Sequence, residues 1–254
     1  MDRHQKILEI LKEKKNVKVQ DLSDALNTST VTIRKDLKIL EAKKLLFRKH
    51  GGASLEQPYV NDKPINEKEF INVKEKSAIG IEASKIISDD QYIIIASGTT
   101  VLAFAKHINP LIKTTVVTSA LNVAIELLNK PNIEVLQLGG YIRQSSNSVI
   151  GHYSELILKE TACSKLFLSV DGIDLDYGLT TSNALEAHLN QQMIESSKEV
   201  IVLADSSKFG KKSFGRICEI DQVDHIITDN KISKDIVEKI KSLGITITIA
   251  NHED

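Results

Sequence analysis

The sequence predicts an α/β protein with two domains: a small helical domain of residues 1–53 and a doubly wound, mostly parallel α/β domain of residues 74–254. Three observations predict this division. The first segment combines helical apolar periodicity with an excess of lysine and arginine. Residues 54–73 are polar and interrupted by Pro58 and Pro64, which indicates a linker. Beyond the linker, short apolar runs alternate with amphipathic stretches, as in a parallel sheet covered by helices.

The small domain is expected to contain three helices. The first is indicated by Ile7, Leu8 and Leu11. A shorter second one is indicated by Leu22, Ala25 and Leu26 and ends in a turn at residues 27–28. Ser29 then precedes a third helix that starts near Thr30, and its side-chain oxygen can accept a hydrogen bond from a free backbone N–H of the first turn. This order is that of a helix-turn-helix.

The third helix is expected to have two unlike faces. At 100° per residue, Ile33, Leu37 and Leu40 form one narrow apolar stripe suited to packing. The opposite side gathers hydroxyl, apolar and cationic side chains. They are Thr30, Val31, Arg34, Lys35 and Lys38.

A basic hairpin is expected to follow the third helix. Apolar residues 45–47 run into Arg48, Lys49 and His50 and end at a pair of glycines, Gly51 and Gly52. Residues 1–53 hold 13 lysines and arginines against 7 acids, whereas the rest of the chain holds 20 against 27. This split favours a DNA-binding winged helix-turn-helix over the alternative of an ordinary helical domain with a solvated lysine face.

Double-stranded DNA is therefore the expected partner of the small domain. Thr30, Val31 and Lys35 are expected near base edges, and Arg34 and Lys38 near phosphates, together with the hairpin cations. The complete set of expected DNA-contacting residues is Ser29, Thr30, Val31, Thr32, Arg34, Lys35, Lys38, Arg48, Lys49 and His50.

Residues 1–53 resemble the N-terminal domain of the DeoR family of bacterial transcriptional repressors. That family's pattern S-x-x-T-I-R-[RK]-D-L corresponds to Ser29 to Leu37, and its closing H-G-G-A corresponds to His50 to Ala53. The resemblance implies repression of transcription by a homo-oligomer, a dimer or a tetramer, bound to operator DNA.

Composition narrows the other possibilities. No apolar run preceded by positive charge opens the chain, and no stretch reaches about 18 apolar residues, so neither secretion nor a membrane partner is expected. We expect a cytoplasmic protein. Cys163 and Cys218 are isolated, and the histidines lack metal-ligand spacing, so neither a metal site nor a cofactor is predicted.

The large domain is expected to contain seven buried strands separated mostly by helices. The expected strands are Tyr92–Ala96, Thr115–Thr118, Ile133–Leu138, Leu166–Val170, Val200–Ala204, Ile226–Thr228 and Ile245–Ile249. The helical stretches between them include Val101–Ile108, Leu121–Leu128, Ala184–Ser196 and Lys234–Leu243.

Small polar and charged residues follow five of these strands, where a parallel sheet binds its ligands. The residues expected to bind an effector there are Ser97, Gly98, Thr99, Thr100, Thr118, Ser119, Gly139, Gly140, Arg143, Asp171, Gly172 and Lys208. Hydroxyls, glycines and cations of this kind suit a phosphorylated sugar or polyol, with S-G-T-T at a helix start as the phosphate cradle. The alternative for S-G-T-T is a simple helix cap.

These segments also resemble the C-terminal domain of the same family, through S-G-T-T, L-G-G with a following arginine, D-G-I-D, and A-D-S-S-K-F-G at 204–210. That domain is similar in fold to ribose-5-phosphate isomerase, and the resemblance implies sensing of a phosphorylated sugar with derepression on binding. Two positions depart from the family pattern. Ala96 stands where an acid is common, and Ser119 stands where the family has asparagine.

The isomerase resemblance supplies an alternative function, an enzyme that interconverts aldose and ketose phosphates. Glu186 would then be the general base, with Asp171, Asp174 and Asp176 carried over from the isomerase motif. The isomerase's lysine and glycine run is missing from Gly178–Thr181, so an enediolate would lose its main stabilising charge. No catalytic residue is therefore predicted, and Glu186 is expected to accept a ligand hydroxyl or to be a helix surface charge.

Overall fold

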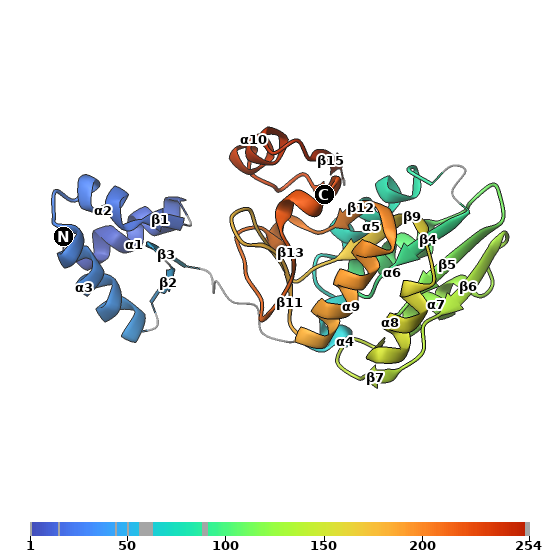
Figure 1. The fold of residues 1–254 in the computed structure, drawn as a ribbon. Helices are drawn as coiled ribbons and strands as arrows, with labels where there is room; N and C mark the ends of the chain where they lie inside the picture. The colour runs from blue at the N-terminus through green and yellow to red at the C-terminus, as the bar shows by residue number, and fades with distance from the viewer. Residues whose placement is uncertain are drawn as a thin grey trace. The chain divides into compact units, whose positions relative to one another are not determined.

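The computed structural model describes residues 2–14, 16–43, 45–49, 51–55, 63–87 and 91–251. They fall into two compact units, residues 1–59 and 60–254, each of which is described by itself (Figure 1).

The N-terminal unit is a winged helix-turn-helix, as predicted. Three helices are followed by a hairpin, and strand β1 completes a three-stranded sheet in the order β1-β3-β2. The elements are α1 (Arg3–Lys14), β1 (Asn16–Lys18), α2 (Val19–Ala25), α3 (Thr30–Ala42), β2 (Phe47–Lys49) and β3 (Gly52–Ser54). Gly52 lies so close to β1 that a Cβ there would be 2.4 Å from the Val17 carbonyl oxygen, so only glycine fits the base of the wing.

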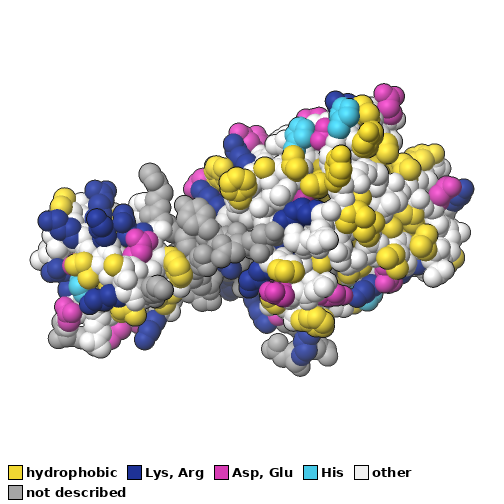
Figure 2. All heavy atoms as spheres, turned by 90° about the horizontal axis from the view of Figure 1, so that it is seen from below, with side chains coloured by type: hydrophobic (Ala, Val, Ile, Leu, Met, Phe, Trp, Pro, Cys, Tyr) yellow, Lys and Arg dark blue, Asp and Glu magenta, His cyan; other side chains and the backbone are white. Residues whose placement is uncertain are grey.

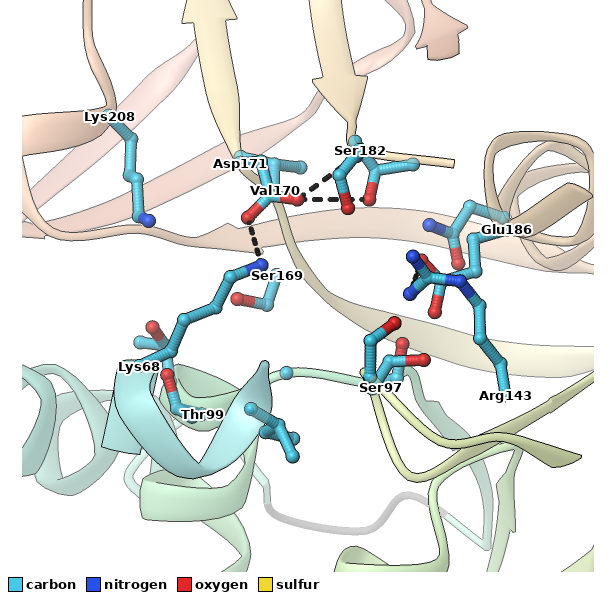
Figure 3. A pocket seen from close by; sticks show the side chains of 17 residues that line it. Lys68, Ser97, Thr99, Arg143, Ser169, Val170, Asp171, Ser182, Glu186 and Lys208 are labelled. Carbon is cyan, nitrogen blue, oxygen red and sulfur yellow. Dashed lines mark hydrogen bonds and ion pairs between the residues drawn. The ribbon is translucent and has the colours of Figure 1, made fainter. Parts of the chain in front are cut away.

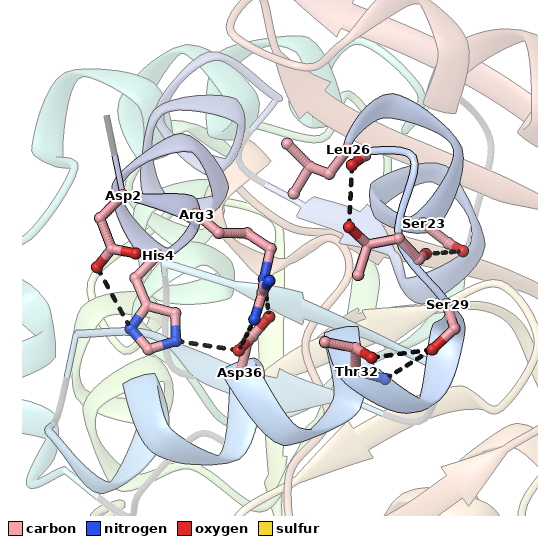
Figure 4. Close-up of polar contacts among 9 residues, drawn as sticks. Asp2, Arg3, His4, Ser23, Leu26, Ser29, Thr32 and Asp36 are labelled. Carbon is pink, nitrogen blue, oxygen red and sulfur yellow. Dashed lines mark hydrogen bonds and ion pairs between the residues drawn. The ribbon is translucent and has the colours of Figure 1, made fainter.

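A buried carboxylate ties α1 to α3. Asp36 lies on the inner face of α3 beside the apolar stripe of Ile33, Leu37 and Leu40, and its side chain is 5% exposed. Arg3 Nε and Nη2 donate to its two oxygens at 2.6 and 3.0 Å, and His4 Nε2 lies 3.1 Å from Oδ1 (Figure 4). The hydrogen bond from Arg3 is the main reason why the pKa of Asp36 is lowered. Sequence periodicity did not indicate this ion pair, because Asp36 sits on the face expected to be apolar.

The segment expected to be a linker is partly helical. Helix α4 (Ile65–Glu69) begins directly after Pro64, although the sequence suggested that this proline interrupts the segment. Pro64 is the N-cap of α4, where its missing N–H removes no helical hydrogen bond, so it precedes the helix without blocking it. Ile65 is buried, and its N–H donates to the Ser145 carbonyl at 2.7 Å, so α4 belongs to the C-terminal unit.

The C-terminal unit is built on a seven-stranded parallel sheet with the order β15-β14-β12-β9-β4-β5-β6. All seven predicted strands are present. Their bounds are β4 (Tyr92–Ile95), β5 (Thr114–Thr118), β6 (Ile133–Gln137), β9 (Cys163–Ser169), β12 (Ser197–Leu203), β14 (His225–Asp229) and β15 (Thr246–Ala250). Side chains alternate between two cores: Ile93 and Ile95 belong to one, and Ile94 to the other.

Helices cover both faces of the sheet, which confirms the doubly wound fold (Figure 1). One core is covered by α5 (Val73–Ser84), α6 (Thr99–His107) and α7 (Leu121–Leu127), and the other by α8 (His152–Lys159), α9 (Ala184–Glu195) and α10 (Lys234–Ser242). Helices α5 and α6 are in very close contact, because a Cβ at Gly80 would lie 2.8 Å from the Ala103 backbone. No helix in the described ranges is both long enough and apolar enough to cross a membrane.

Two small antiparallel sheets were not predicted. One is the hairpin of β7 (Tyr141–Arg143) and β8 (Ser148–Ile150); the other has the order β10-β11-β13 and comprises β10 (Gly172–Asp174), β11 (Gly178–Thr181) and β13 (Gly215–Cys218). The short 3₁₀ helices η1 (Ser206–Lys208) and η2 (Ile220–Gln222) flank β13. These strands are three or four residues long, too short to give a clear alternating pattern.

The Asp36 ion pair predicts local destabilisation on its removal. Asp36→Ala should lower the free energy of unfolding of the N-terminal unit by roughly 1–2 kcal/mol, because two donors lose a buried acceptor. Hydrogen exchange of the α1 and α3 amides in the full chain measures this. Asp24→Ala is the control, since the one hydrogen bond that the Asp24 carboxylate accepts from a described residue is an exposed one from Gln20. Equal exchange in both variants would contradict the assignment.

The same carboxylate predicts acid sensitivity. Its pKa is lowered in the folded protein, so its stabilisation is complete above the ordinary carboxyl pKa of 3.8 and is lost as the pH falls through the lower folded value. In the wild type, the protection of the α1 and α3 amides from hydrogen exchange should fall over that pH range. In Asp36→Ala, the same protection should change less with pH.

Candidate functional site

The outer face of α3 carries the side chains expected to contact DNA. Ser29 caps the helix by accepting the Thr32 N–H at 3.2 Å, and the Thr32 hydroxyl lies 2.9 Å from Ser29 Oγ (Figure 4). Val31 is 59% exposed, although it is apolar. A shallow hollow on this face is lined by Val31, Arg34, Lys35, Lys38 and Arg48. Lysine and arginine side chains gather over this unit in Figure 2.

The wing is attached to the end of α3 through Arg48. The Arg48 N–H donates to Glu41 Oε1 at 3.0 Å, and its guanidinium lies 3.6 Å from Glu41 Oε2. Arg48 is thus ion-paired, and it would have to share or leave Glu41 to hold a phosphate. The structure places the Lys49 backbone in β2, whereas His50 lies outside the described residues.

A second site is a pocket of about 50 Å³ at the carboxyl ends of β4 and β9, where a parallel sheet is expected to bind ligands (Figure 3). It draws side chains from strand ends, from α4 and α9, and from the loops between β7 and β8 and after β12. The lining residues are Ile65, Lys68, Ser97, Gly98, Thr99, Thr100, Arg143, Ser145, Ser146, Ser169, Val170, Asp171, Thr181, Ser182, Glu186, Asn190 and Lys208.

The start of α6 forms one wall of the pocket. Its N-cap is Gly98, so no side chain caps the helix, and the first backbone N–H groups have no acceptor within the helix. The hydroxyls of Ser97, Thr99 and Thr100 line the pocket beside them. Gly98 has φ +132°, and a Cβ there would be 2.7 Å from the Ser169 side chain, which explains why glycine is required. This arrangement favours an anion-binding helix start over a simple cap.

An ion pair crosses the pocket from α4 to the end of β9. Lys68 Nζ donates to Asp171 Oδ1 at 2.8 Å, while Asp171 Oδ2 accepts the Ser182 N–H at 3.0 Å and the Thr181 hydroxyl at 3.3 Å. Burial raises the pKa of Asp171, but the charge and hydrogen bond of Lys68, helped by Lys208, outweigh it and keep the pKa below its usual value. Asp171 is therefore held as a carboxylate. Its negative charge is balanced by Lys68, and both of its oxygens already accept hydrogen bonds.

A second ion pair forms the opposite wall. Arg143 Nη1 lies 3.2 Å from Glu186 Oε2, and Ser148 Oγ donates to Glu186 Oε1 at 3.1 Å. Glu186 is buried, so it is not a surface charge of α9. Its two oxygens orient Arg143 along the wall, and Asn190 lines the pocket one helical turn further along.

Lys208 gives the pocket its excess of positive charge. Its ammonium forms no hydrogen bond or ion pair with any residue that the structure describes, and it lies on the same side of the pocket as Lys68 and Asp171 (Figure 3). Three cations face two carboxylates that are already bonded, and a helix start faces the same space. The pocket is thus suited to an anionic group attached to a hydroxylated carbon chain.

Eight of the thirteen residues expected to bind an effector line this pocket. The other five do not belong to its lining: Thr118, Ser119, Gly139, Gly140 and Gly172. The Thr118 hydroxyl accepts the Ala120 N–H at 3.1 Å, and the Ser119 carbonyl accepts the Val149 N–H at 2.8 Å. A Cβ at Gly140 or Gly172 would lie 2.5 Å from a backbone oxygen of Ile150 or Lys211, so close packing explains these glycines.

Several lining residues were missed by the sequence reasoning. Lys68 was missed because α4 lies in the expected linker, and nothing local indicates that its lysine reaches the sheet. Ser182 follows β11, a strand too short to predict. Asn190 could have been found, because it lies one turn beyond Glu186 on a predicted helix.

The residues considered for isomerase chemistry are arranged differently from a proton-transfer site. Both oxygens of Glu186 already accept hydrogen bonds, and Asp174 accepts the N–H groups of Asp176 and Tyr177 in a turn. Gly178–Thr181 is strand β11, which is buried and carries no lysine.

Comparison with known proteins gives the same two-part division. Residues 3–58 match the DeoR-like helix-turn-helix domain, and residues 71–230 match the DeoR C terminal sensor domain. The chain is 38% identical to the "Uncharacterized HTH-type transcriptional regulator YulB" of Bacillus subtilis strain 168, over 97% of this chain and 95% of that protein. It is 34% identical to the "Putative aga operon transcriptional repressor" of Escherichia coli O157:H7, over 98% of this chain and 93% of that protein.

Among solved structures, a D-ribose-5-phosphate isomerase in complex with phospho-erythronic acid matches 53% of this chain and 52% of that chain. The match has a TM-score of 0.38 and 17% identity, which is too distant to bear on function.

Proposed function

The chain belongs to the DeoR family of transcriptional regulators, and from this premise we propose that it represses a sugar or polyol operon until a phosphorylated metabolite binds its C-terminal unit. The observation that carries the proposal is the pocket at the ends of β4 and β9, where an uncapped helix start faces cations and hydroxyls. Such a pocket suits a phosphate bearing a hydroxylated chain.

The DNA half of the proposal rests on the outer face of α3. Val31 is exposed at the start of the helix, where it can meet a thymine methyl group, with Thr30 and Lys35 beside it. Arg34 and Lys38 would bind phosphates, and Arg48 would do so from the wing. We assign Arg48 a smaller contribution to DNA affinity than Arg34 and Lys38, because its guanidinium is already paired with Glu41.

Helix α4 offers a physical link between ligand and DNA. It is the first helix after the segment that joins the two units in the chain. Its Lys68 donates a hydrogen bond to Asp171 in the pocket and so attaches the helix there. A bound phosphate would compete with Asp171 for Lys68 and so favour a different position of α4. A ligand shifts a conformational equilibrium only through such a difference in contacts.

The proposal includes a homo-oligomer, a dimer or a tetramer, acting on operator DNA in the cytoplasm. A helix-turn-helix protein with two-fold symmetry reads two half-sites about one helical turn apart, and each copy would contribute one α3.

The first prediction concerns DNA. Arg34→Ala should weaken binding to all sequences similarly and should make the slope of log K against log salt shallower by about 0.9, the value for one lost phosphate contact. Val31→Ala should instead change the preference at one base position. Fluorescence anisotropy over a salt series measures both effects. Lys234→Ala, an exposed lysine of α10, is the charge-matched control. An Arg34→Ala protein with unchanged affinity and slope would contradict the assignment of α3.

The second prediction concerns the effector. Thr99→Asp should reduce effector affinity by more than about tenfold, because a carboxylate would face the phosphate. An acid in the first turn favours a helix, so α6 should stay folded. The variant should bind operator but no longer be released, as judged by mobility shifts with and without phosphorylated sugars. Thr99→Asn, the uncharged isostere, should still respond. Normal release of Thr99→Asp would place the phosphate elsewhere.

The third prediction separates a sensor from an enzyme. The purified protein should not isomerise ribose 5-phosphate above the background rate, because β11 lacks the lysine that would stabilise an enediolate. A coupled assay for ribulose 5-phosphate measures this. Turnover that disappears in Glu186→Gln would support the enzyme instead.

A further inference from the structure

A second hollow of about 200 Å³ opens beside the pocket at the ends of β4 and β9. The two share Lys68, Asp171 and Lys208 as common walls, so one ligand can extend from the first into the second. The first pocket, at about 50 Å³, has room for only a few water molecules. A phosphate held at the start of α6 would therefore leave the second hollow as an adjoining space for the rest of the ligand.

The second hollow is lined by lysines, and we call it the lysine hollow: Lys63, Lys68, Lys76, Lys208 and Lys211. Two acids line it among the residues that the structure describes, and both are already bonded. Asp171 accepts from Lys68, Ser182 and Thr181. Asp205 accepts the Asn72 side-chain amide at 3.0 Å and the Ser207 N–H at 3.1 Å, and it also accepts the Ser207 hydroxyl. The lysine hollow therefore keeps an excess of positive charge.

Lys76 is the most informative residue of the lysine hollow. It lies on α5 and is only 5% exposed, and its ammonium donates to the Lys68 carbonyl oxygen at 2.6 Å. It forms no ion pair with any acid in the described part of the chain. Burial, followed by the nearby charges of Lys208 and Lys68, lowers its pKa to about 8, although Asp205 opposes the shift. A buried ammonium without a carboxylate opposes folding, and it still has donors to offer.

We propose that the lysine hollow binds a second anionic group of the effector, a phosphate or a carboxylate, at the far end of a ligand whose first phosphate sits at the start of α6. This inference rests on the proposed function, because the first phosphate site is the one assigned there. The effector is thus a doubly anionic polyol or sugar, such as a bisphosphate or a phosphorylated sugar acid.

Binding to the full chain by isothermal titration calorimetry tests this with four probes: inorganic phosphate, fructose 6-phosphate, fructose 1,6-bisphosphate and 6-phosphogluconate. At least one of the two doubly anionic probes should bind about tenfold or more tightly than fructose 6-phosphate, the gain expected from added charge-assisted hydrogen bonds. Preference for the bisphosphate assigns a second phosphate, and preference for the gluconate assigns a carboxylate.

Two variants locate the effect. In Lys76→Met and Lys211→Ala, the ratio of the affinity for the doubly anionic probe to the affinity for fructose 6-phosphate should fall close to one. Lys74→Ala is the matched control, since it removes an exposed lysine from the same helix as Lys76 but outside the lysine hollow, and it should retain the preference. Lys76→Met should melt at the same temperature as wild type or higher, because it removes a buried charge that opposes folding.

The outcomes distinguish the two proposals. Equal affinity for singly and doubly anionic probes, or a preference that survives in Lys76→Met and Lys211→Ala, would overturn the second anionic site and leave the first phosphate site intact. Failure of all four probes to bind would overturn the proposed function and this inference with it.

Discussion

The parallel pairing of β4 with β9 is the constraint on which the C-terminal site depends. Parallel strands end at the same edge of a sheet, so the residues after β4, which open α6, are brought against Ser169 at the end of β9 and Asp171 just after it. The approach is tight enough that Gly98 admits no side chain. Without this pairing, the helix start and the bonded carboxylate would not face each other across one small volume.

Charge balance then decides what this edge of the sheet can bind. Asp171 and Glu186 are buried acids, and each is matched to a cation and to further donors, so their negative charge is largely neutralised. Lys208 and Lys76 lack an acid partner among the described residues. Lys208 lies where the start of α6 also faces, and Lys76 lies in the adjoining lysine hollow, so an anion is favoured in both spaces.

Much of the fold could be predicted because its strands are buried apolar runs and its helices are periodic. Ile93–Ile95 and Val200–Leu203 are short runs of branched apolar residues, a pattern typical of buried strands. The S-G-T-T segment that follows the first run indicated where that strand ends. What could not be predicted depends on contacts distant in sequence. Lys68 reaches Asp171 across 103 positions, and Arg3 reaches Asp36 across 33, so no local pattern reveals either pair. Gly140 and Gly172, which the sequence suggested as ligand contacts, are also required by backbone packing, a reason that depends on distant residues as well.

The close contact between α5 and α6 at Gly80 has a consequence for ligand selection. Helix α6 contributes Thr99 and Thr100 to the first pocket, and α5 contributes Lys76 to the lysine hollow. The distance between the two helices therefore affects which ligand can contact both sets of side chains. Because backbone atoms meet at Gly80 and Ala103, their spacing is fixed by the main chain and cannot relax through a change of rotamer. The spacing of the two helix backbones is therefore set by the scaffold, and the proposed effector would have to match that spacing through its own length and the reach of the Lys76 side chain.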